Sequence, residues 1–140
     1  MNVFDSLITA QFNGVSEFLK AEAAQYKIPV SQIAYIALIN EGRLLTGLVK
    51  DRTVLRPLPL GNLALKVFKE ELDPDKLERI TKLIRSLIAG TANDHELTEA
   101  NVVMVIRTED DDNPTIWLQH QANRLEQIPT VEFARMMYHA

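Results

Sequence analysis

Two hydrophobic patterns alternate along the chain. In some segments apolar residues recur every three or four positions, which predicts helices that turn one face to a core. Other, shorter segments are apolar at nearly every position. Residues 3–26 show the first pattern, with one apolar stripe running from Phe4 to Leu19. We expect this first helix to end before Pro29, because proline disfavours helical geometry at the residue before it.

The best strand candidates are apolar on both faces. They are the run that begins at Ile33 and ends at Ile39, the run 44–49 and the run 102–106. A half-exposed strand alternates apolar with polar side chains, because successive side chains point to opposite faces. These runs do not alternate. Both faces of the sheet therefore need a cover, from the chain's own helices or from another molecule.

The first strands are predicted to form a three-stranded meander. Asn40, Glu41 and Gly42 separate the first two apolar runs and fit a three-residue hairpin loop with glycine in the left-handed region. A short third strand is expected over residues 53–56. A competing interpretation of residues 33–39 is a short helix capped by Ser31. The Ile and Tyr content of the run favours the strand.

Two helices are expected after the meander. Asn62 is a candidate cap for a helix over residues 62–72. Asp73 followed by Pro74 is a cap with proline at the first helical position, where the missing N–H costs nothing. From there an apolar stripe runs to Ile88, and Gly90 is placed to terminate the helix. Residues 91–100 form a polar connection.

A second hairpin and a last helix complete the expected elements. The hairpin joins residues 102–106 to residues 115–118, and the helix covers residues 130–138. Trp117 lies between Ile116 and Leu118 in a half-polar alternation, which is typical of an edge strand. Residues 33–39 and 102–106 then belong nearer the centre of the sheet.

The resulting order, α-βββ-αα-ββ-α, predicts an α+β fold with a mainly antiparallel sheet of about five strands. At 140 residues we expect one domain, 1–140. Four helices can cover both faces of such a sheet thinly or one face thoroughly. In the second case the other face meets a partner, and we expect a homodimer.

Composition narrows the functional classes. The chain has no cysteine, which excludes disulfides, thiolate metal sites and thiol nucleophiles. The net charge of −4 argues against nucleic acid as a partner. No apolar run reaches the ~20 residues of a membrane span. We expect a cytoplasmic protein without a membrane partner.

No known catalytic or phosphate-binding motif is present. Glu109, Asp110, Asp111 and Asp112 form an acidic turn that can be a cation site or a solvated loop. Asp94, His95 and Glu96 lack the second histidine of a zinc-protease pattern. Two clusters of basic residues are candidates for phosphate contacts, but such clusters are equally typical of solvated faces. The first consists of Arg43, Lys50, Arg52 and Arg56, and the second of Lys76, Arg79, Lys82 and Arg85.

The C-terminal segment supplies the candidate partner-binding residues Phe133, Met136, Met137 and Tyr138. Methionine is flexible and polarisable and suits surfaces that meet variable partners. The alternative is that this helix packs on the chain's own sheet.

The leading hypothesis is a non-catalytic protein–protein interaction module: a small dimeric adaptor, regulator or chaperone-like protein with no cofactor. The element order is similar to that of small acidic type III secretion chaperones, and this similarity implies a dimer. The alternative is a small-molecule- or metal-binding domain, with or without enzymatic activity. Its pocket would lie between sheet and helices, with polar groups from Tyr35, His95, Glu96 or His120.

Overall fold

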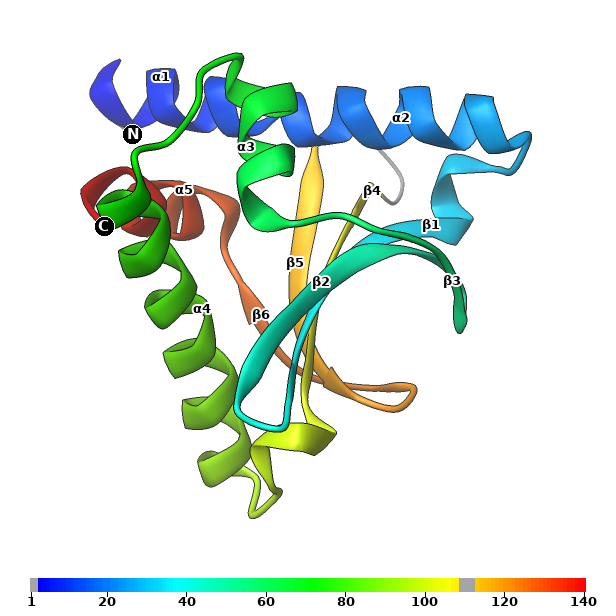
Figure 1. The fold of residues 1–140 in the computed structure, drawn as a ribbon, viewed down its shortest axis with the longest axis vertical. Coiled ribbons are helices and arrows are strands. Elements are labelled where there is room, and N and C mark those ends of the chain that lie inside the picture. Colours follow the sequence, from blue (N-terminus) through cyan, green and yellow to red (C-terminus); the bar gives the residue numbers. More distant parts are fainter. Residues whose placement is uncertain (1–2, 109–112) are drawn as a thin grey trace.

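The computed structural model describes residues 3–108 and 113–140. Within these residues one antiparallel sheet of six strands has the order β3-β2-β1-β4-β5-β6 (Figure 1). The strands are β1 (Ile33–Asn40), β2 (Arg43–Lys50), β3 (Thr53–Pro57), β4 (Val103–Thr108), β5 (Pro114–His120) and β6 (Asn123–Ile128). The helices are α1 (Val3–Phe12), α2 (Gly14–Tyr26), α3 (Leu60–Phe68), α4 (Pro74–Asp94) and α5 (Thr130–His139), with 3₁₀ turns at Val30–Gln32 and Glu99–Asn101.

The α+β class and the antiparallel sheet are confirmed, and the order gains one strand: α-βββ-αα-βββ-α. The sixth strand, β6, reads Asn-Arg-Leu-Glu-Gln-Ile and is polar because it forms the edge of the sheet. The placement of the Trp117 strand at an edge is therefore wrong. Trp117 pairs with Val105 on one side and Gln127 on the other.

The prediction for the centre of the sheet is confirmed. Strand β1 lies between β2 and β4, and it pairs antiparallel with both. The helix interpretation of residues 33–39 is wrong, since Ser31 lies in a single 3₁₀ turn and the strand begins at Ile33. The β1–β2 loop is also shorter than expected. Only Glu41 and Gly42 connect the strands, with φ of 53° and 76°, which is the mirror-image turn that glycine favours.

Helix ends differ most from the sequence prediction. The first helix is broken at Asn13 into α1 and α2. Helix α3 begins at Leu60 after Pro59, so Asn62 is not its cap, and it stops at Lys69, whose φ is 57°. The Asp73 cap is confirmed, since its Oδ1 accepts from the backbone N–H of Lys76 at 2.8 Å. Helix α4 continues through Gly90 to Asp94, where the polar connection was expected.

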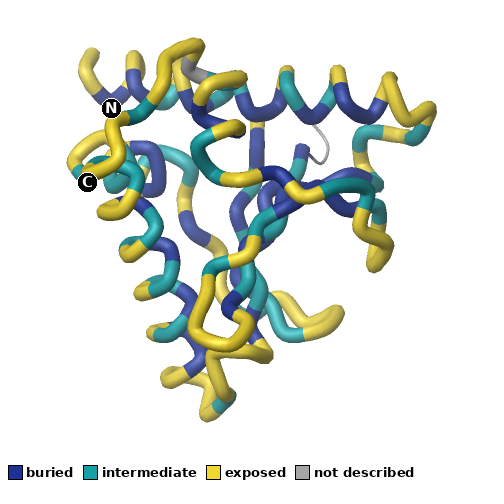
Figure 2. The backbone as a smooth tube through the Cα atoms, in the orientation of Figure 1, coloured by how far each residue is buried: buried dark blue, intermediate teal, exposed yellow. Residues whose placement is uncertain are grey.

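The main core lies between the sheet and the helices. Helices turn their buried sides inward and their exposed sides outward, which is clearest along α4 in Figure 2. Tyr35, Leu48, Met104 and Ile116 come from the sheet and are at most 1% exposed. Within the part of the chain that the structure describes, no helix is long and apolar enough to cross a membrane.

Two ion pairs fasten helices to distant segments. Arg135 of α5 binds both carboxylate oxygens of Asp5 in α1, at 3.2 and 2.7 Å. The hydrogen bond and the charge of Asp5 raise the pKa of Arg135 above its ordinary value. Arg56 of β3 pairs with Glu22 of α2, a largely buried carboxylate. These pairs fix α1 against α5, and α2 against the edge strand β3.

Candidate interaction surface

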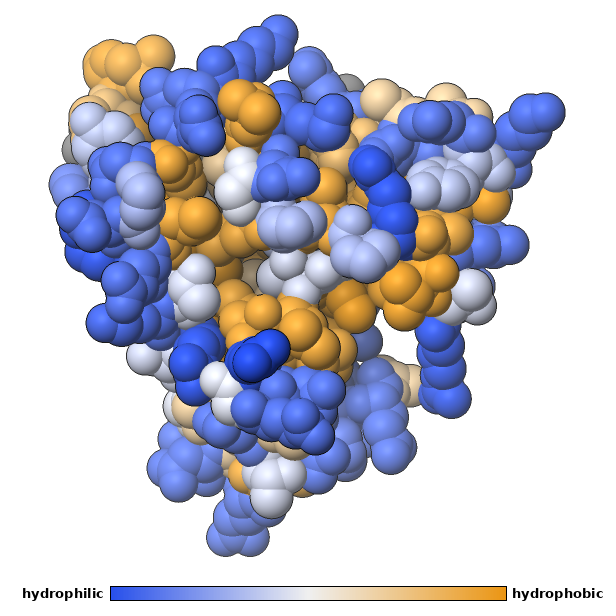
Figure 3. Space-filling view, in the orientation of Figure 1, coloured by the Kyte–Doolittle hydropathy of each residue, from blue (hydrophilic) through white to orange (hydrophobic). Residues whose placement is uncertain are grey.

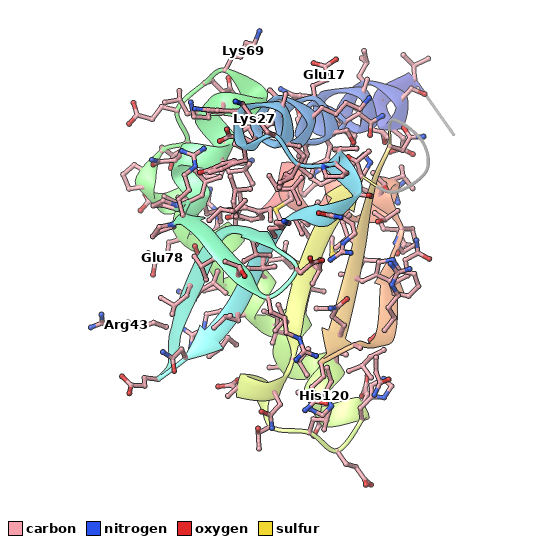
Figure 4. All side chains as sticks on the ribbon, turned by 90° about the vertical axis from the view of Figure 1, so that its right-hand side faces the viewer. Glu17, Lys27, Arg43, Lys69, Glu78 and His120 are labelled. Carbon is pink, nitrogen blue, oxygen red and sulfur yellow. The ribbon has the colours of Figure 1, made fainter. Side chains whose placement is uncertain are left out.

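Among the residues that the structure describes, no helix covers one face of the sheet (Figure 4). In Figure 4 this face turns toward the viewer, with α4 behind the sheet and α2 across its upper end. Directly paired residues point to the same face of a sheet, so the register assigns its members. Ala34 pairs with Val49, and Ile36 pairs with Val105. These side chains, with Val103, form an apolar cluster separate from the main core.

Two large apolar side chains on this helix-free face are exposed. Leu45 of β2 pairs with Leu38 and is 46% exposed. Val54 of β3 pairs with Val49 and is 65% exposed. Nothing in the sequence alone distinguishes these two residues. The signal was present in the apolarity of run 44–49 on both faces, but only the register shows which face each residue occupies.

The β5–β6 side of the helix-free face is more polar. Arg124 of β6 stacks over the Trp117 ring, with its guanidinium carbon 4.7 Å from the ring centroid. The indole Nε1 of Trp117 is buried and has no hydrogen-bond partner. Arg107 of β4 pairs in register with Thr115 on the same face. The helix-free face thus has an apolar half on β1, β2 and the first part of β4, and an arginine-bearing half with Arg107 near the end of β4 and Arg124 on β6.

The predicted C-terminal partner-binding residues occupy different environments. Phe133 is 2% exposed and packs against the Phe12 ring, with centroids 5.3 Å apart. Met136 and Met137 are partly buried against the core. Tyr138 is 50% exposed. Helix α5 therefore packs on its own domain, and partner binding by these residues stays a prediction.

Tyr138 belongs to a second apolar patch, formed where the two ends of the described chain meet. Its ring contacts Phe4 edge-to-face at 5.0 Å. Phe4 is 41% exposed, and its neighbours on α1, Val3 and Leu7, are more exposed still. We call these four residues, Val3, Phe4, Leu7 and Tyr138, the terminal patch.

The polar residues proposed for a pocket are not brought together. His95 and Glu96 are exposed at the end of α4. His120 ends β5 at the lower end of the sheet in Figure 4. Tyr35 is buried in β1. Among the described residues no hydrogen bond or ion pair joins any two of these four, so no acid–base pair is formed by them.

Tyr35 has an unusual environment. Burial raises the pKa of Tyr35 to about 12, against a smaller opposing effect of the Thr46 hydroxyl. Thr46 donates its own hydrogen to the Leu58 carbonyl, with 2.6 Å between the oxygens. The Tyr35 hydroxyl is buried and makes no hydrogen bond of acceptable geometry. It therefore remains a neutral phenol inside the core.

Metal ligands do not gather in the residues that the structure describes: no three His, Asp or Glu side chains are placed to hold an ion. The acidic turn of Glu109, Asp110, Asp111 and Asp112 lies outside the described residues. The predicted basic groups are partly used inside the molecule. Arg56 pairs with Glu22, and Lys82 pairs with Glu78 at 3.4 Å. Arg43 projects away from the sheet in Figure 4.

No family model, curated protein or solved structure matches the chain. Function must therefore be inferred from the fold and its surfaces.

Proposed function

We propose that the chain is a non-catalytic protein–protein interaction module that forms a homodimer through the helix-free face of its sheet. The observation that carries this proposal is the apolar half of that face. It contains one small buried cluster and, beside it, the exposed side chains of Leu45 and Val54. Contiguous apolar surface of this kind marks interaction sites in soluble proteins.

The size and composition of the face fit an interface. The four strands β3, β2, β1 and β4, ~4.8 Å apart and about six residues long, give roughly 400 Å² in projection, and side-chain relief adds accessible area. A standard interface buries about 600–1,000 Å² on each partner. The arrangement of an apolar centre beside Trp117, Arg107 and Arg124 also matches common interfaces, where aromatic residues and arginine are enriched.

A second copy of the chain is the partner that the charge distribution favours. Ala34, Ile36, Leu38, Val49 and Val105 form an uncharged centre, with Arg43 at the end of β2 on the same face, so the centre can stack on its own copy. A two-fold axis through β1 and β2 stacks the two apolar halves. It also carries the Arg107 and Arg124 side of each copy to opposite ends of the interface, where like charges do not meet.

The test is the mass in solution of a double variant, Leu45→Lys with Val54→Lys. Both side chains are exposed in the single chain, so the substitutions cost the fold little. In the dimer they place like charges across the two-fold axis. We expect the native protein to show twice its chain mass of 15.9 kDa by light scattering, and the double variant to show one chain mass.

The matched control is Leu65→Lys, on the helix side, where Leu65 is 51% exposed. It removes a similar apolar side chain and should leave the dimer intact. A native protein that stays monomeric at ~100 µM would contradict the proposal. Dissociation by Leu7→Lys in the terminal patch, with none by the double variant, would move the interface to α1 and α5 and overturn it too.

A further inference from the structure

An apolar pocket lies on the other side of the sheet, between it and the helices. Its volume is about 210 Å³. The sheet contributes Tyr35, Met104 and Ile106, and helices α1 to α5 supply the walls. Figure 3 shows this side of the molecule hollowed between α4 and α3, with apolar side chains in the hollow. Three of the four predicted C-terminal residues, Phe133, Met137 and Tyr138, line it.

The pocket is larger than ordinary packing leaves. Protein interiors hold few voids wider than a water molecule. An engineered apolar cavity of ~150 Å³ stays dry and binds benzene, so 210 Å³ has room for about six to eight carbon atoms in a chain or a substituted ring. The hydroxyl of Tyr35 is sealed from the pocket, because that oxygen has no accessible surface. The interior therefore selects an apolar group.

Apart from Tyr35 and Tyr138, the polar residues of the described lining are Gln11, Glu70 and Lys76. Gln11 and Glu70 are exposed, which places the mouth of the pocket among α1, the α3–α4 connection and the start of α4. The Lys76 ammonium makes two contacts there. It donates to the backbone carbonyl of Tyr138 at 2.8 Å and lies 5.6 Å from the Tyr138 ring centroid.

These contacts leave Lys76 able to bind an anion. An ammonium has three donors, and the Tyr138 carbonyl uses one. Glu70, the carboxylate among the lining residues, is turned to solvent, where its charge is screened. A cation at the mouth of an apolar pocket matches a molecule with a carbon chain at one end and a carboxylate at the other.

We propose that this pocket binds a small amphiphilic carboxylate, with a hydrocarbon body of about six to eight carbons inside and its carboxylate on Lys76. The site is distinct from the proposed dimer face, which lies on the opposite side of the sheet. Ligand binding and dimerisation can therefore succeed or fail separately.

Calorimetric titration of the full chain with sodium octanoate tests the site. Hexanoate and decanoate give the length dependence. We expect one octanoate per chain. Each added methylene should raise the affinity about 4-fold while room remains, and the gain should stop once the pocket is full. Octylammonium, with the same chain and the opposite charge, should bind more weakly than octanoate.

Variants of the protein separate the contribution of the ligand's hydrocarbon chain from that of its carboxylate. Lys76→Gln should weaken octanoate about 5-fold and leave 1-octanol unchanged, because only the carboxylate contacts the ammonium. Lys82→Gln, on the same helix and outside the pocket, is the matched control and should not change octanoate binding. Ala64→Leu and Ala134→Leu each place a larger side chain in the pocket wall and should weaken octanoate more than 10-fold.

Three results would overturn the proposal. One is the absence of saturable octanoate binding by the folded native protein. A second is unchanged affinity in Ala64→Leu and Ala134→Leu, provided that far-UV circular dichroism shows both variants folded. The third is tighter binding of octylammonium than of octanoate, which would mean that Glu70, and not Lys76, binds the ligand's charged group at the mouth of the pocket.

Discussion

At the scale of single residues, the buried hydroxyl groups differ in whether they form a hydrogen bond. Ser16 accepts a hydrogen bond from Thr108 at 2.8 Å, so that contact between α2 and β4 is satisfied. The Tyr35 hydroxyl is the contrasting case, because it is buried without a partner of good geometry. A buried donor that forms no hydrogen bond has lost its hydration without replacement. The fold tolerates Tyr35 as a large ring and gains little from its oxygen.

Tyr35→Phe should therefore leave stability at pH 7 unchanged or slightly raised. The difference should appear in alkali. The pKa of Tyr35 is about 12 in the folded protein and near 10 in an unfolded chain, so both states are neutral below pH 10. Above pH 10 the unfolded chain ionises first. Native stability should then fall by up to ~1.4 kcal/mol per pH unit until about pH 12, and the variant should lack that part of the decline.

Urea unfolding at intervals from pH 7 to pH 11.5 measures this difference. Tyr26→Phe is the matched control, because Tyr26 is 37% exposed at the end of α2. It should follow the native curve throughout. A gap between the native protein and Tyr35→Phe that stays constant across this pH range would show that the phenol does not ionise differently in the two states.

At the scale of elements, hydrophobic pattern predicted the centre of the sheet well and its margins poorly. The runs in β1 and β4 are apolar on both faces because one face packs against the helices and the other carries the apolar cluster of Ala34, Val49 and Val105. The edge strand β6 has no such requirement, and its sequence resembles a loop. The helix ends were predicted poorly for a similar reason. Glycine often ends a helix, but the buried residues Thr91 and Ala92 keep the turn after Gly90 helical in α4.

The candidate surface shows the same limit. Sequence indicated that the sheet needs a cover on both faces, and the structure shows which face lacks a helix. It did not indicate Leu45 and Val54, because their exposure depends on strand register and on where the helices pack. Sequence offered a pocket between sheet and helices as an alternative, with Tyr35 among its residues, but it could not indicate the apolar lining, which comes from five helices and two strands that meet only in the folded chain.

Replacing two glycines in different elements by alanine should change the stability of the protein in opposite directions. Gly90 lies inside α4 with open space where a Cβ would be, so Gly90→Ala should stabilise the protein by about 0.5–1 kcal/mol. A Cβ on Gly47 of β2 would lie 2.9 Å from the Arg56 carbonyl oxygen of β3. Gly47→Ala should therefore destabilise by about 1–3 kcal/mol, because backbone must shift to admit it.

The urea concentrations at the unfolding midpoints give both changes in stability, provided that the slope of the unfolding free energy against urea is unchanged. Each variant serves as the control for the other, since the substitution is chemically identical. A loss of stability in Gly90→Ala would mean that α4 is not continuous through residue 90. An unchanged midpoint in Gly47→Ala would mean that β3 does not approach β2 as closely as the structure shows.

At the scale of the whole molecule, the sheet separates two proposed binding functions. Its helix-free face is the proposed contact with a second copy, and the pocket for an amphiphilic carboxylate lies among the helices behind it. No residue that lines the pocket belongs to the apolar cluster of the helix-free face. The two binding events should therefore contribute independently to stability.

Thermal unfolding tests this independence. If the folded state is a dimer, its midpoint rises with protein concentration, by about 2 °C per tenfold increase for a dimer of this size. The Leu45→Lys, Val54→Lys variant should melt at a midpoint that does not change between 2 and 200 µM (roughly two tenfold steps). Saturating octanoate should raise the midpoint of both proteins to a similar extent, because the pocket is intact in each. If octanoate stabilised only the dimeric native protein, the pocket would depend on the second copy, and the two faces of the sheet would be coupled.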